Sequence, residues 1–375
     1  MRSVIPRKAL LLLFALVVFG LFWADAGRAE VLLRDAAGRE VRLAKPAERI
    51  VTNESLLLLE LALIDRDPVS KLAGWAAPRR LDRGIYARFR QRFPAIDSIP
   101  VVGGVVPPNT NIESLLSVDP DLFVVSLWDP GWEEISAGLE AAGVPTIFLD
   151  APGKTTSNPA EAVGFSVELL GKAIGREAQA NEFSAYMLSH YRAVVERLSS
   201  LKDRPLVLID AFAGTECCST PGRGNRLTEY LHLAGAKSVG EDVIPGYDGR
   251  VSPEAVIGEE PSVYVGTGGP HLSAQDGLVL GGKINPESAR ASLQAVLSQG
   301  VRRELKAVRE GRAYGISHQL SISALSILAF ECFAKWTHPV LFADLSPEQT
   351  LADINQRFLA VPLEGTFWIE LRSKP

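Results

Sequence analysis

Cysteine and histidine are scarce in this sequence of 375 residues, which holds three cysteines and five histidines. The histidines are scattered and form no His-rich loop, so direct binding of bare zinc or manganese ions is not expected. Three cysteines cannot all pair with one another. The adjacent Cys217 and Cys218 could form a disulfide, one of them could pair with Cys332, or all three could be buried thiols.

Several common catalytic motifs are also missing. The sequence contains no His-Glu-x-x-His and no Gly-x-Ser-x-Gly motif. Residues 277–283 repeat the glycine and lysine spacing of a phosphate-binding loop, but Ile284 stands where such a loop has Ser or Thr. Asp210 follows a predicted strand and has no evident base or metal partner nearby in the sequence. We therefore expect a protein that binds its ligand without changing it, not an enzyme.

Positive charge is not in excess, because 39 Lys and Arg residues stand against 44 Asp and Glu residues, a net charge of −5. Loss of residues 1–29 would remove four basic residues and one acidic residue and bring the net charge to −8. A nucleic acid is therefore not an expected partner. The composition, 47% apolar and 22% charged, is that of a globular protein, and the length suits two domains.

Residues 1–29 have the features of a cleaved signal peptide. Arg2, Arg7 and Lys8 precede an apolar run over residues 9–24, and small residues follow at positions 27 and 29. The run is short for a transmembrane anchor, and no stop-transfer cluster of charges follows it. Because no cysteine lies near the cleavage site, a lipid anchor is not expected. The mature protein is predicted to be soluble and exported to a bacterial periplasm.

Predicted strands and helices alternate on both sides of a central helical segment. This alternation predicts an α/β fold with parallel sheets whose faces are covered, in an N-terminal lobe over residues 30–158 and a C-terminal lobe over residues 202–375. The predicted strands begin near residues 49, 69, 101, 122, 146, 205, 263 and 312.

Residues 159–201 form the predicted connection between the lobes. Apolar residues recur there at helical spacing, for example Phe183, Met187 and Tyr191. Gly171 and Gly175 are expected to break the segment, which leaves a backbone helix over about 176–201. A helix of about 25 residues spans roughly 38 Å, so we interpret it as a rigid spacer.

Two segments of the chain match each other, residues 111–125 and residues 252–265. In both, a capping residue stands two positions before a glutamate, Glu113 or Glu254, and a proline follows seven positions after it. Each glutamate could simply complement the dipole of a helix N-terminus. Alternatively, the two carboxylates could dock on a two-fold symmetric partner that carries arginines.

Further motifs occur at residues 217–224 (CCSTPGRG), 312–319 (RAYGISHQ) and 334–345 (AKWTHPVLFADL). With the two Glu-x6-Pro segments, they make the whole mature chain resemble the periplasmic binding proteins of ABC importers for iron–siderophores, haem, cobalamin and related metal chelates. The resemblance implies two Rossmann-like lobes joined by a single long helix, the class III architecture, and a monomer. It also implies that Glu113 and Glu254 form salt bridges with arginines of the ABC permease.

The ligand implied by the resemblance is a ferric-siderophore-type complex held in the cleft between the lobes. The same fold could instead bind haem or cobalamin, and an enzyme that processes metal chelates is the alternative from another class. Members of this branch often carry Trp-His-Gln-Phe-Tyr where residues 317–321 here read SHQLS. The Trp, Phe and Tyr rings of that motif are thus missing from the expected pocket wall, so the ligand of a relative cannot be transferred to this chain.

Candidate ligand contacts lie where predicted strands end, because ligands of parallel α/β units bind beyond the carboxyl ends of the strands. Trp75 and Trp128 could stack on a planar chelate, although core packing explains them equally well. Arg79, Arg80 and Arg223 could pair with carboxylates of an anionic siderophore, or belong to a solvated face. His271 and His318 could bind iron or donate a hydrogen bond, or be ordinary half-buried histidines.

Overall fold

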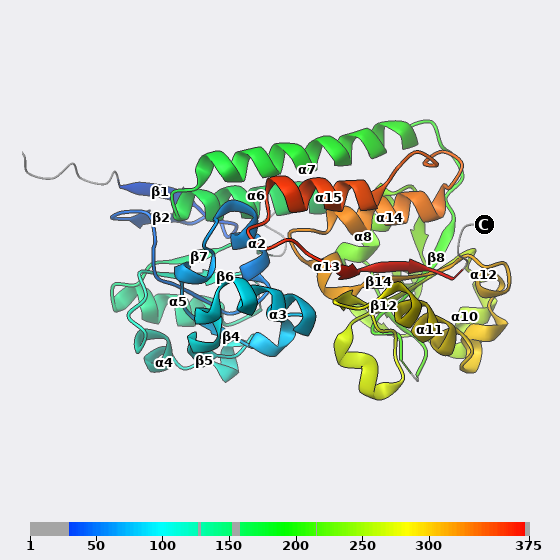
Figure 1. Cartoon of the computed structure of the whole chain (residues 1–375), viewed down its shortest axis with the longest axis horizontal. Helices are drawn as coiled ribbons and strands as arrows, with labels where there is room; N and C mark the ends of the chain where they lie inside the picture. The colour runs from blue at the N-terminus through cyan, green and yellow to red at the C-terminus, as the bar shows by residue number, and fades with distance from the viewer. Residues whose placement is uncertain (1–29, 127–128, 152–157, 215, 372–375) are drawn as a thin grey trace, which may run out of the picture.

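The computed structural model describes residues 30–126, 129–151, 158–214 and 216–371. The predicted signal peptide and Trp128 lie outside the described residues. Figure 1 shows two α/β lobes side by side, each built on a five-stranded sheet. In the described part of the chain, no helix has the length and apolar character needed to cross a membrane.

The sheet of the N-terminal lobe is parallel throughout, with the strand order β5-β4-β3-β6-β7. The order reverses on the two sides of β3, so the carboxyl end of β3 is the topological switch point where doubly wound folds bind ligands. The strands are β3 Ile50–Thr52, β4 Leu72–Ala76, β5 Val101–Gly103, β6 Leu122–Val125 and β7 Thr146–Phe148. The helices are α2 Leu57–Ile64, α3 Arg83–Arg92, α4 Ile112–Leu116 and α5 Trp132–Ala141, and a hairpin of β1 Val31–Arg34 and β2 Glu40–Leu43 precedes them.

The sheet of the C-terminal lobe has the order β10-β8-β12-β14-β16, in which only β16 is antiparallel to its neighbour. Its strands are β8 Leu206–Asp210, β10 Lys237–Ser238, β12 Val263–Gly268, β14 Ala313–Ser317 and β16 Trp368–Glu370. The small pairs are β9 Ser219–Pro221 with β11 Asp248–Arg250, and β13 Gly281–Gly282 with β15 Gly365–Thr366. The helices are α8 Arg226–Leu233, α9 Gly240–Val243, α10 Pro253–Gly258, α11 Pro286–Leu297, α12 Lys306–Arg309, α13 His318–Ile322, α14 Ile327–Thr337 and α15 Pro347–Arg357.

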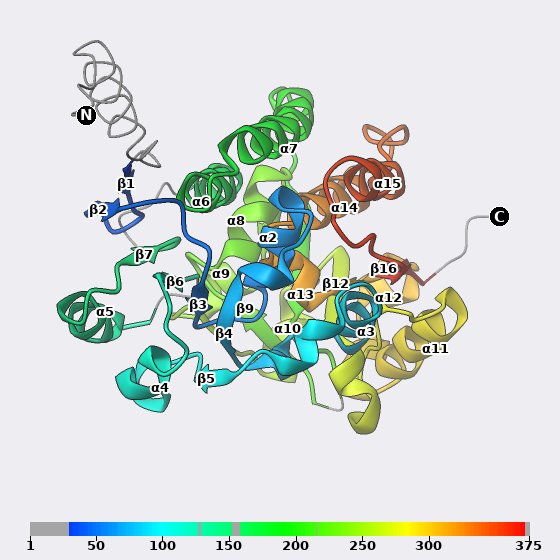
Figure 2. The same ribbon diagram turned by 60° about the vertical axis from the view of Figure 1, so that its left-hand side comes forward.

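Two consecutive helices connect the lobes, α6 Pro159–Ala173 and α7 Glu177–Leu198. The break between them lies at Gly175, whose φ of +70° favours glycine over other residues. The 22 residues of α7 span roughly 33 Å, and the helix runs over both lobes (Figures 1 and 2). It contacts α2 on one side of the molecule and α14 on the other.

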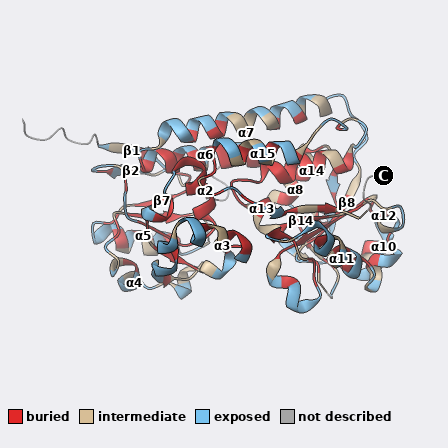
Figure 3. Cartoon of the chain, viewed as in Figure 1, coloured by how far each residue is buried: buried red, intermediate tan, exposed pale blue. Residues whose placement is uncertain are grey.

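The largest hydrophobic core continues from one lobe into the other beneath α6 and α7 (Figure 3). On α7 its members recur at helical spacing, at Ala180, Phe183, Met187, Tyr191 and Val194. Two smaller clusters fill the outer parts of the C-terminal and N-terminal lobes. The lobes therefore share one core where they meet the connecting helices.

A second contact joins the lobes on the side away from α7, between the start of α3 and β13. Oδ1 of Asp82 caps α3 by accepting hydrogen bonds from Gly84 N at 2.7 Å and Ile85 N at 3.0 Å. Its other oxygen, Oδ2, accepts a hydrogen bond from Gly282 N across the interface at 3.1 Å. Gly282 belongs to residues 277–283, the segment with the spacing of a phosphate-binding loop. This segment therefore contacts the capped N-terminus of α3, a helix of the opposite lobe.

This contact depends on glycine, because a Cβ atom on Gly84 would overlap the backbone carbonyl of Gly282. We expect Gly84→Ala to destabilise the protein by ~1–3 kcal/mol or to separate the lobes, since backbone cannot yield as a side chain can. Urea unfolding and the radius of gyration in solution measure the two effects.

Gly258→Ala is the matched control, because a Cβ on Gly258 meets open space within a helix. Its unfolding free energy should stay within about 1 kcal/mol of the wild type. Equal unfolding free energies and equal radii of gyration for the two variants would contradict the close contact between Gly84 and Gly282.

Candidate functional site

A cavity of about 320 Å³ lies between the lobes and is called the inner pocket below. Apolar side chains from α2, α6 and the end of β7 form one wall, among them Leu57, Leu149 and Val163. The charged or ionisable residues at the inner pocket are Glu54, Glu60, Arg80, Asp150, Arg226, Tyr247, Asp248 and His318. Residues of both lobes line the pocket, at the carboxyl ends of the parallel strands where ligands of such folds bind.

Two ion pairs border the inner pocket. Nε of Arg80 lies 2.7 Å from Oε2 of Glu54, and burial raises the pKa of the Glu54 carboxyl against the opposing effect of the Arg80 charge. Nη2 of Arg226 donates to Oδ2 of Asp150 at 2.7 Å, and this pair joins the C-terminal lobe to the N-terminal lobe. Each arginine at the pocket is therefore already engaged with a carboxylate.

Glu60 is the unusual member of the set, because it stands in the leucine-rich helix α2 and is only 9% exposed. Its Oε1 accepts a hydrogen bond from Ser166 Oγ at 2.8 Å. Among the described residues, its Oε2 has no hydrogen-bond partner. Burial raises the pKa of Glu60 to about 7, while the Ser166 hydroxyl and the Arg226 charge oppose the shift.

His318 begins α13 directly after β14. Its Nδ1 lies 3.1 Å from Thr267 Oγ1, and its ring packs on Phe212 with 4.0 Å between the ring centroids. Burial, followed by the nearby His271 and Arg80, lowers the pKa of His318 to about 4. The imidazole is therefore neutral at neutral pH and can offer a nitrogen lone pair or an N–H to a ligand.

A second cavity of about 640 Å³, the outer pocket, lies beside the first and is also formed by both lobes. Its lining includes Arg79, Arg83 and Tyr86 from one lobe and His271 and Gln319 from the other. The side-chain amide of Gln319 donates to the backbone carbonyl of Arg80, a residue of the inner pocket. Within the described part of the chain, neither Arg79 nor Arg83 forms an ion pair. The two arginines outnumber the one acidic residue of the lining, Asp82, so the outer pocket carries excess positive charge.

The structure brings four of the predicted ligand contacts to these pockets. Arg80 and His318 line the inner pocket, and Arg79 and His271 line the outer one. Burial lowers the pKa of His271, although Asp82 opposes the shift. The Phe212 ring lies between the two histidines, with 5.8 Å from its centroid to that of His271.

Two other predicted contacts lie elsewhere. Trp75 is 1% exposed and packs in the core beside Tyr86, so its predicted stacking on a ligand is wrong. Arg223 is exposed, pairs with Asp242 at 3.2 Å and lines neither pocket. In its place, Arg226 of the C-terminal lobe lines the inner pocket, and this residue begins α8 three positions later.

Sequence reasoning missed Glu60 and Arg226. The available signal for Glu60 was its place as a single acidic residue within the apolar run of α2. Burying a carboxylate costs free energy, so such a residue indicates a compensating partner or a function. Asn225 caps α8 by accepting a hydrogen bond from Leu227 N at 3.0 Å. This cap marks Arg226 as the first helical residue after a glycine-rich loop.

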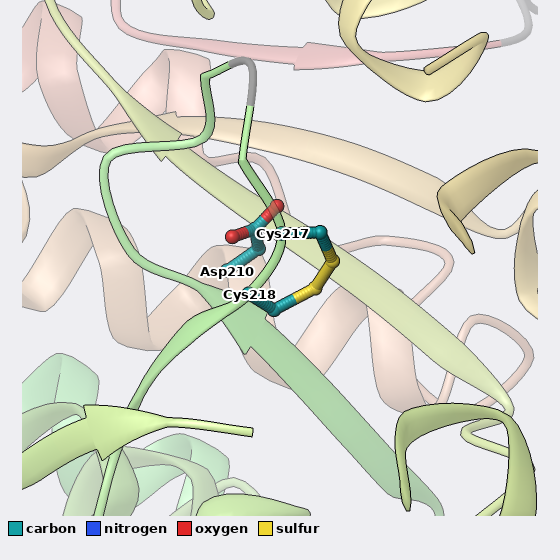
Figure 4. Close-up of side chains that lie close together, drawn as sticks. All are labelled: Asp210, Cys217 and Cys218. Carbon is teal, nitrogen blue, oxygen red and sulfur yellow. A yellow bond between two sulfur atoms is a disulfide. The ribbon is translucent and has the colours of Figure 1, made fainter. Parts of the chain in front are cut away.

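The structure joins Cys217 and Cys218 in a disulfide, beside the buried carboxyl of Asp210 (Figure 4). Cys332 is a buried free thiol. Oδ2 of Asp210 accepts hydrogen bonds from Arg302 Nε at 2.7 Å and from Tyr264 OH at 2.6 Å. Nη2 of Arg302 also donates to the carbonyl of Glu216 at 2.9 Å. This cluster therefore holds the loop that leads from Phe212 to the disulfide.

Glu113 and Glu254 occupy equivalent places in the two lobes. Each lies in the first turn of a short helix, α4 or α10, and each is exposed. The helices are capped alike, by Asn111 Oδ1 accepting from Ser114 N and by Ser252 Oγ accepting from Ala255 N, both at 3.2 Å. Both helices lie on the side of their lobes away from α7 (Figure 1).

Comparison with known proteins gives a consistent result. Residues 89–320 match the model of the family described as periplasmic binding protein. The TroA-like periplasmic binding protein FepB from Veillonella parvula superposes with a TM-score of 0.81 at 26% identity, over 91% of this chain and 100% of that chain.

More distant solved structures share the fold. The molybdate-binding MolA of Haemophilus influenzae has a TM-score of 0.68 at 17% identity, over 89% of this chain and 99% of that chain. A periplasmic haem-binding protein from Pseudomonas aeruginosa has a TM-score of 0.53 at 20% identity, over 78% of this chain and 94% of that chain. No curated protein sequence matches.

The raised pKa of Glu60 predicts a pH dependence of stability. Its pKa is about 7 in the folded protein against 4.5 normally, so the folded state binds more protons between these values. The protein should therefore lose stability as pH rises from 4.5 through 7, on the order of 3 kcal/mol relative to Glu60→Gln. Urea unfolding of both proteins from pH 4.5 to 8 measures the difference, and a constant difference would contradict the assignment.

Proposed function

Because this chain belongs to the periplasmic binding protein family, we propose that it captures a ferric-siderophore-type iron complex between its lobes and delivers it to an ABC permease. Family membership already implies a solute-binding component of an ABC transporter that acts in the periplasm. The iron complex as ligand and Glu113 and Glu254 as permease contacts are the specific parts of the proposal.

The observation that carries the choice of ligand is the chemistry of the outer pocket. Arg79 and Arg83 lie there without ion-pair partners among the described residues, and His271 lies on the opposite wall. Carboxylate, hydroxamate and catecholate oxygens around ferric iron leave electron-rich edges, which guanidinium groups recognise by charge-assisted hydrogen bonds. The cavity of about 640 Å³ is within the range of small-molecule sites.

Haem and cobalamin remain the runner-up ligands. The fold is shared with a haem-binding protein, but the similarity of 20% identity concerns the fold alone. Neutral His318 would be a suitable axial ligand for haem iron, and Arg79 and Arg83 would suit haem propionates. Binding measurements on the mature protein separate these ligands.

Titration of the mature protein with ferric citrate, a ferric catecholate, a ferric hydroxamate, haemin, cobalamin and free metal ions should give saturable quenching of tryptophan fluorescence by one ferric chelate. A dissociation constant of about 1 µM or tighter is expected. A response to haemin or cobalamin alone would replace the proposed ligand. Lack of any response would overturn the proposal.

The docking role of the two glutamates has its own test. The double variant Glu113→Ala, Glu254→Ala should lose at least about tenfold in uptake by cells that express the cognate importer, because charge-assisted pairs with permease arginines are removed. Ligand affinity should not change, since both residues lie outside the two pockets.

Glu287→Ala serves as the matched control, because Glu287 is an exposed glutamate in the first turn of α11. It should keep full uptake. Loss of ligand affinity in the double variant, or equal loss of uptake in the control, would refute the docking assignment.

A further inference from the structure

The inner pocket carries more negative than positive residues. Four carboxyl groups line it, those of Glu54, Glu60, Asp150 and Asp248, against two guanidinium groups, those of Arg80 and Arg226. The two arginines are engaged with Glu54 and Asp150 at 2.7 Å each. Because these pairs are close to neutral, the remaining charge of the pocket comes from Glu60 and Asp248.

Of these two carboxyl groups, Glu60 is the one placed to meet a ligand. Asp248 is exposed to solvent, where water competes for it. Glu60 is 9% exposed, and Ser166 Oγ at 2.8 Å occupies only its Oε1. The second oxygen, Oε2, has no hydrogen-bond partner in the described part of the chain. Because Glu60 lines the pocket and its side chain is largely shielded from water, a donor from a ligand would stabilise this oxygen, and a cationic donor suits it best.

The surroundings of Glu60 indicate the shape of that donor. Leu57, Leu149 and Val163 line the same pocket, so a group that reaches Glu60 passes along an apolar wall. A methylene chain buries favourably there, at about 0.8 kcal/mol for each CH₂ group. An anionic group would be repelled by Glu60. It could pair with Arg80 or Arg226 only by displacing Glu54 or Asp150.

We propose that the inner pocket accepts a positively charged arm of the ligand, an alkyl chain ending in a primary ammonium group that pairs with Glu60. The inference rests on the proposed function and narrows it to ferric chelates with a free amine. The outer pocket, with Arg79 and Arg83, takes the oxygen-rich part of the same chelate. The two pockets of the cleft thus recognise opposite charges on one ligand.

The test compares two chelates that differ in one charge. The probes are a linear ferric trihydroxamate that ends in a primary amine and the same chelate with that amine acetylated, titrated at pH 7.5. The wild type should bind the free amine at least ~10-fold more tightly, as expected for a charge-assisted hydrogen bond. Glu60→Gln should bind both chelates equally.

Glu168→Gln is the matched control, because Glu168 is an exposed glutamate on the neighbouring helix α6. It should keep the wild-type preference. A preference that persists in folded Glu60→Gln, or equal binding of the two chelates by the wild type, would overturn the inference and leave the proposed function intact. If the protein binds ferric citrate but neither hydroxamate, the inference is likewise overturned and the proposed function stays. If it binds no ferric chelate, the proposed function is overturned as well.

A measurement on the unmodified protein covers the case in which Glu60→Gln fails to fold. The pKa of Glu60 is about 7, so its ionised fraction rises roughly tenfold between pH 6 and 8 while an alkylammonium stays charged. Affinity for the free amine, divided by affinity for the acetylated chelate, should rise with that fraction. A ratio that does not change over this range would overturn the pairing with Glu60.

Discussion

The hydrophobic core that the two lobes share beneath α6 and α7 is the constraint on which the rest of the structure depends. Phe183 packs on Phe358, and Tyr191 packs on Phe330, with 5.3 and 4.8 Å between ring centroids. Each such side chain contributes about 1.5–3 kcal/mol by burial, so opening this seam would cost several kcal/mol. The His190–Glu331 pair at 2.8 Å adds a polar contact between α7 and α14. We therefore expect lobe movement to be small.

Burial in the cleft shifts the pKa values of Glu60 and His318 toward the uncharged form of each group. It raises the pKa of Glu60 to about 7 and lowers the pKa of His318 to about 4, and each shift favours the uncharged form. The charges of the inner pocket are the pairs Glu54 with Arg80 and Asp150 with Arg226, the exposed Asp248 and the ionised fraction of Glu60. The Asp150–Arg226 pair joins the two lobes, so it contributes both to the charge of the pocket and to the contact between the lobes.

The sequence was sufficient for the architecture and less so for the site. Alternating strand and helix patterns predicted the parallel sheets, and the spacing of Phe183, Met187 and Tyr191 predicted α7 and its buried face. Trp75 was misassigned because β4 is buried on both faces, which hides where a side chain points. Arg223 and Arg226 lie three positions apart, and only the cap at Asn225 decides which one enters the pocket. Glu60 lies at the pocket beside Ser166 of another helix, a tertiary contact that the local sequence pattern cannot reveal.

Opposite charge in the two pockets has a consequence for delivery. A ligand with an ammonium arm in the inner pocket and an oxygen-rich centre in the outer pocket would be held in one orientation, since reversal places like charges together. The arm would lie among residues of α2 and α6, and the metal centre would lie toward α3 and His271. Glu113 and Glu254 lie on the side of the lobes away from α7 (Figure 1). If the permease docks there, every bound ligand would reach it in the same orientation, so charge recognition in the cleft would also determine which end leaves first.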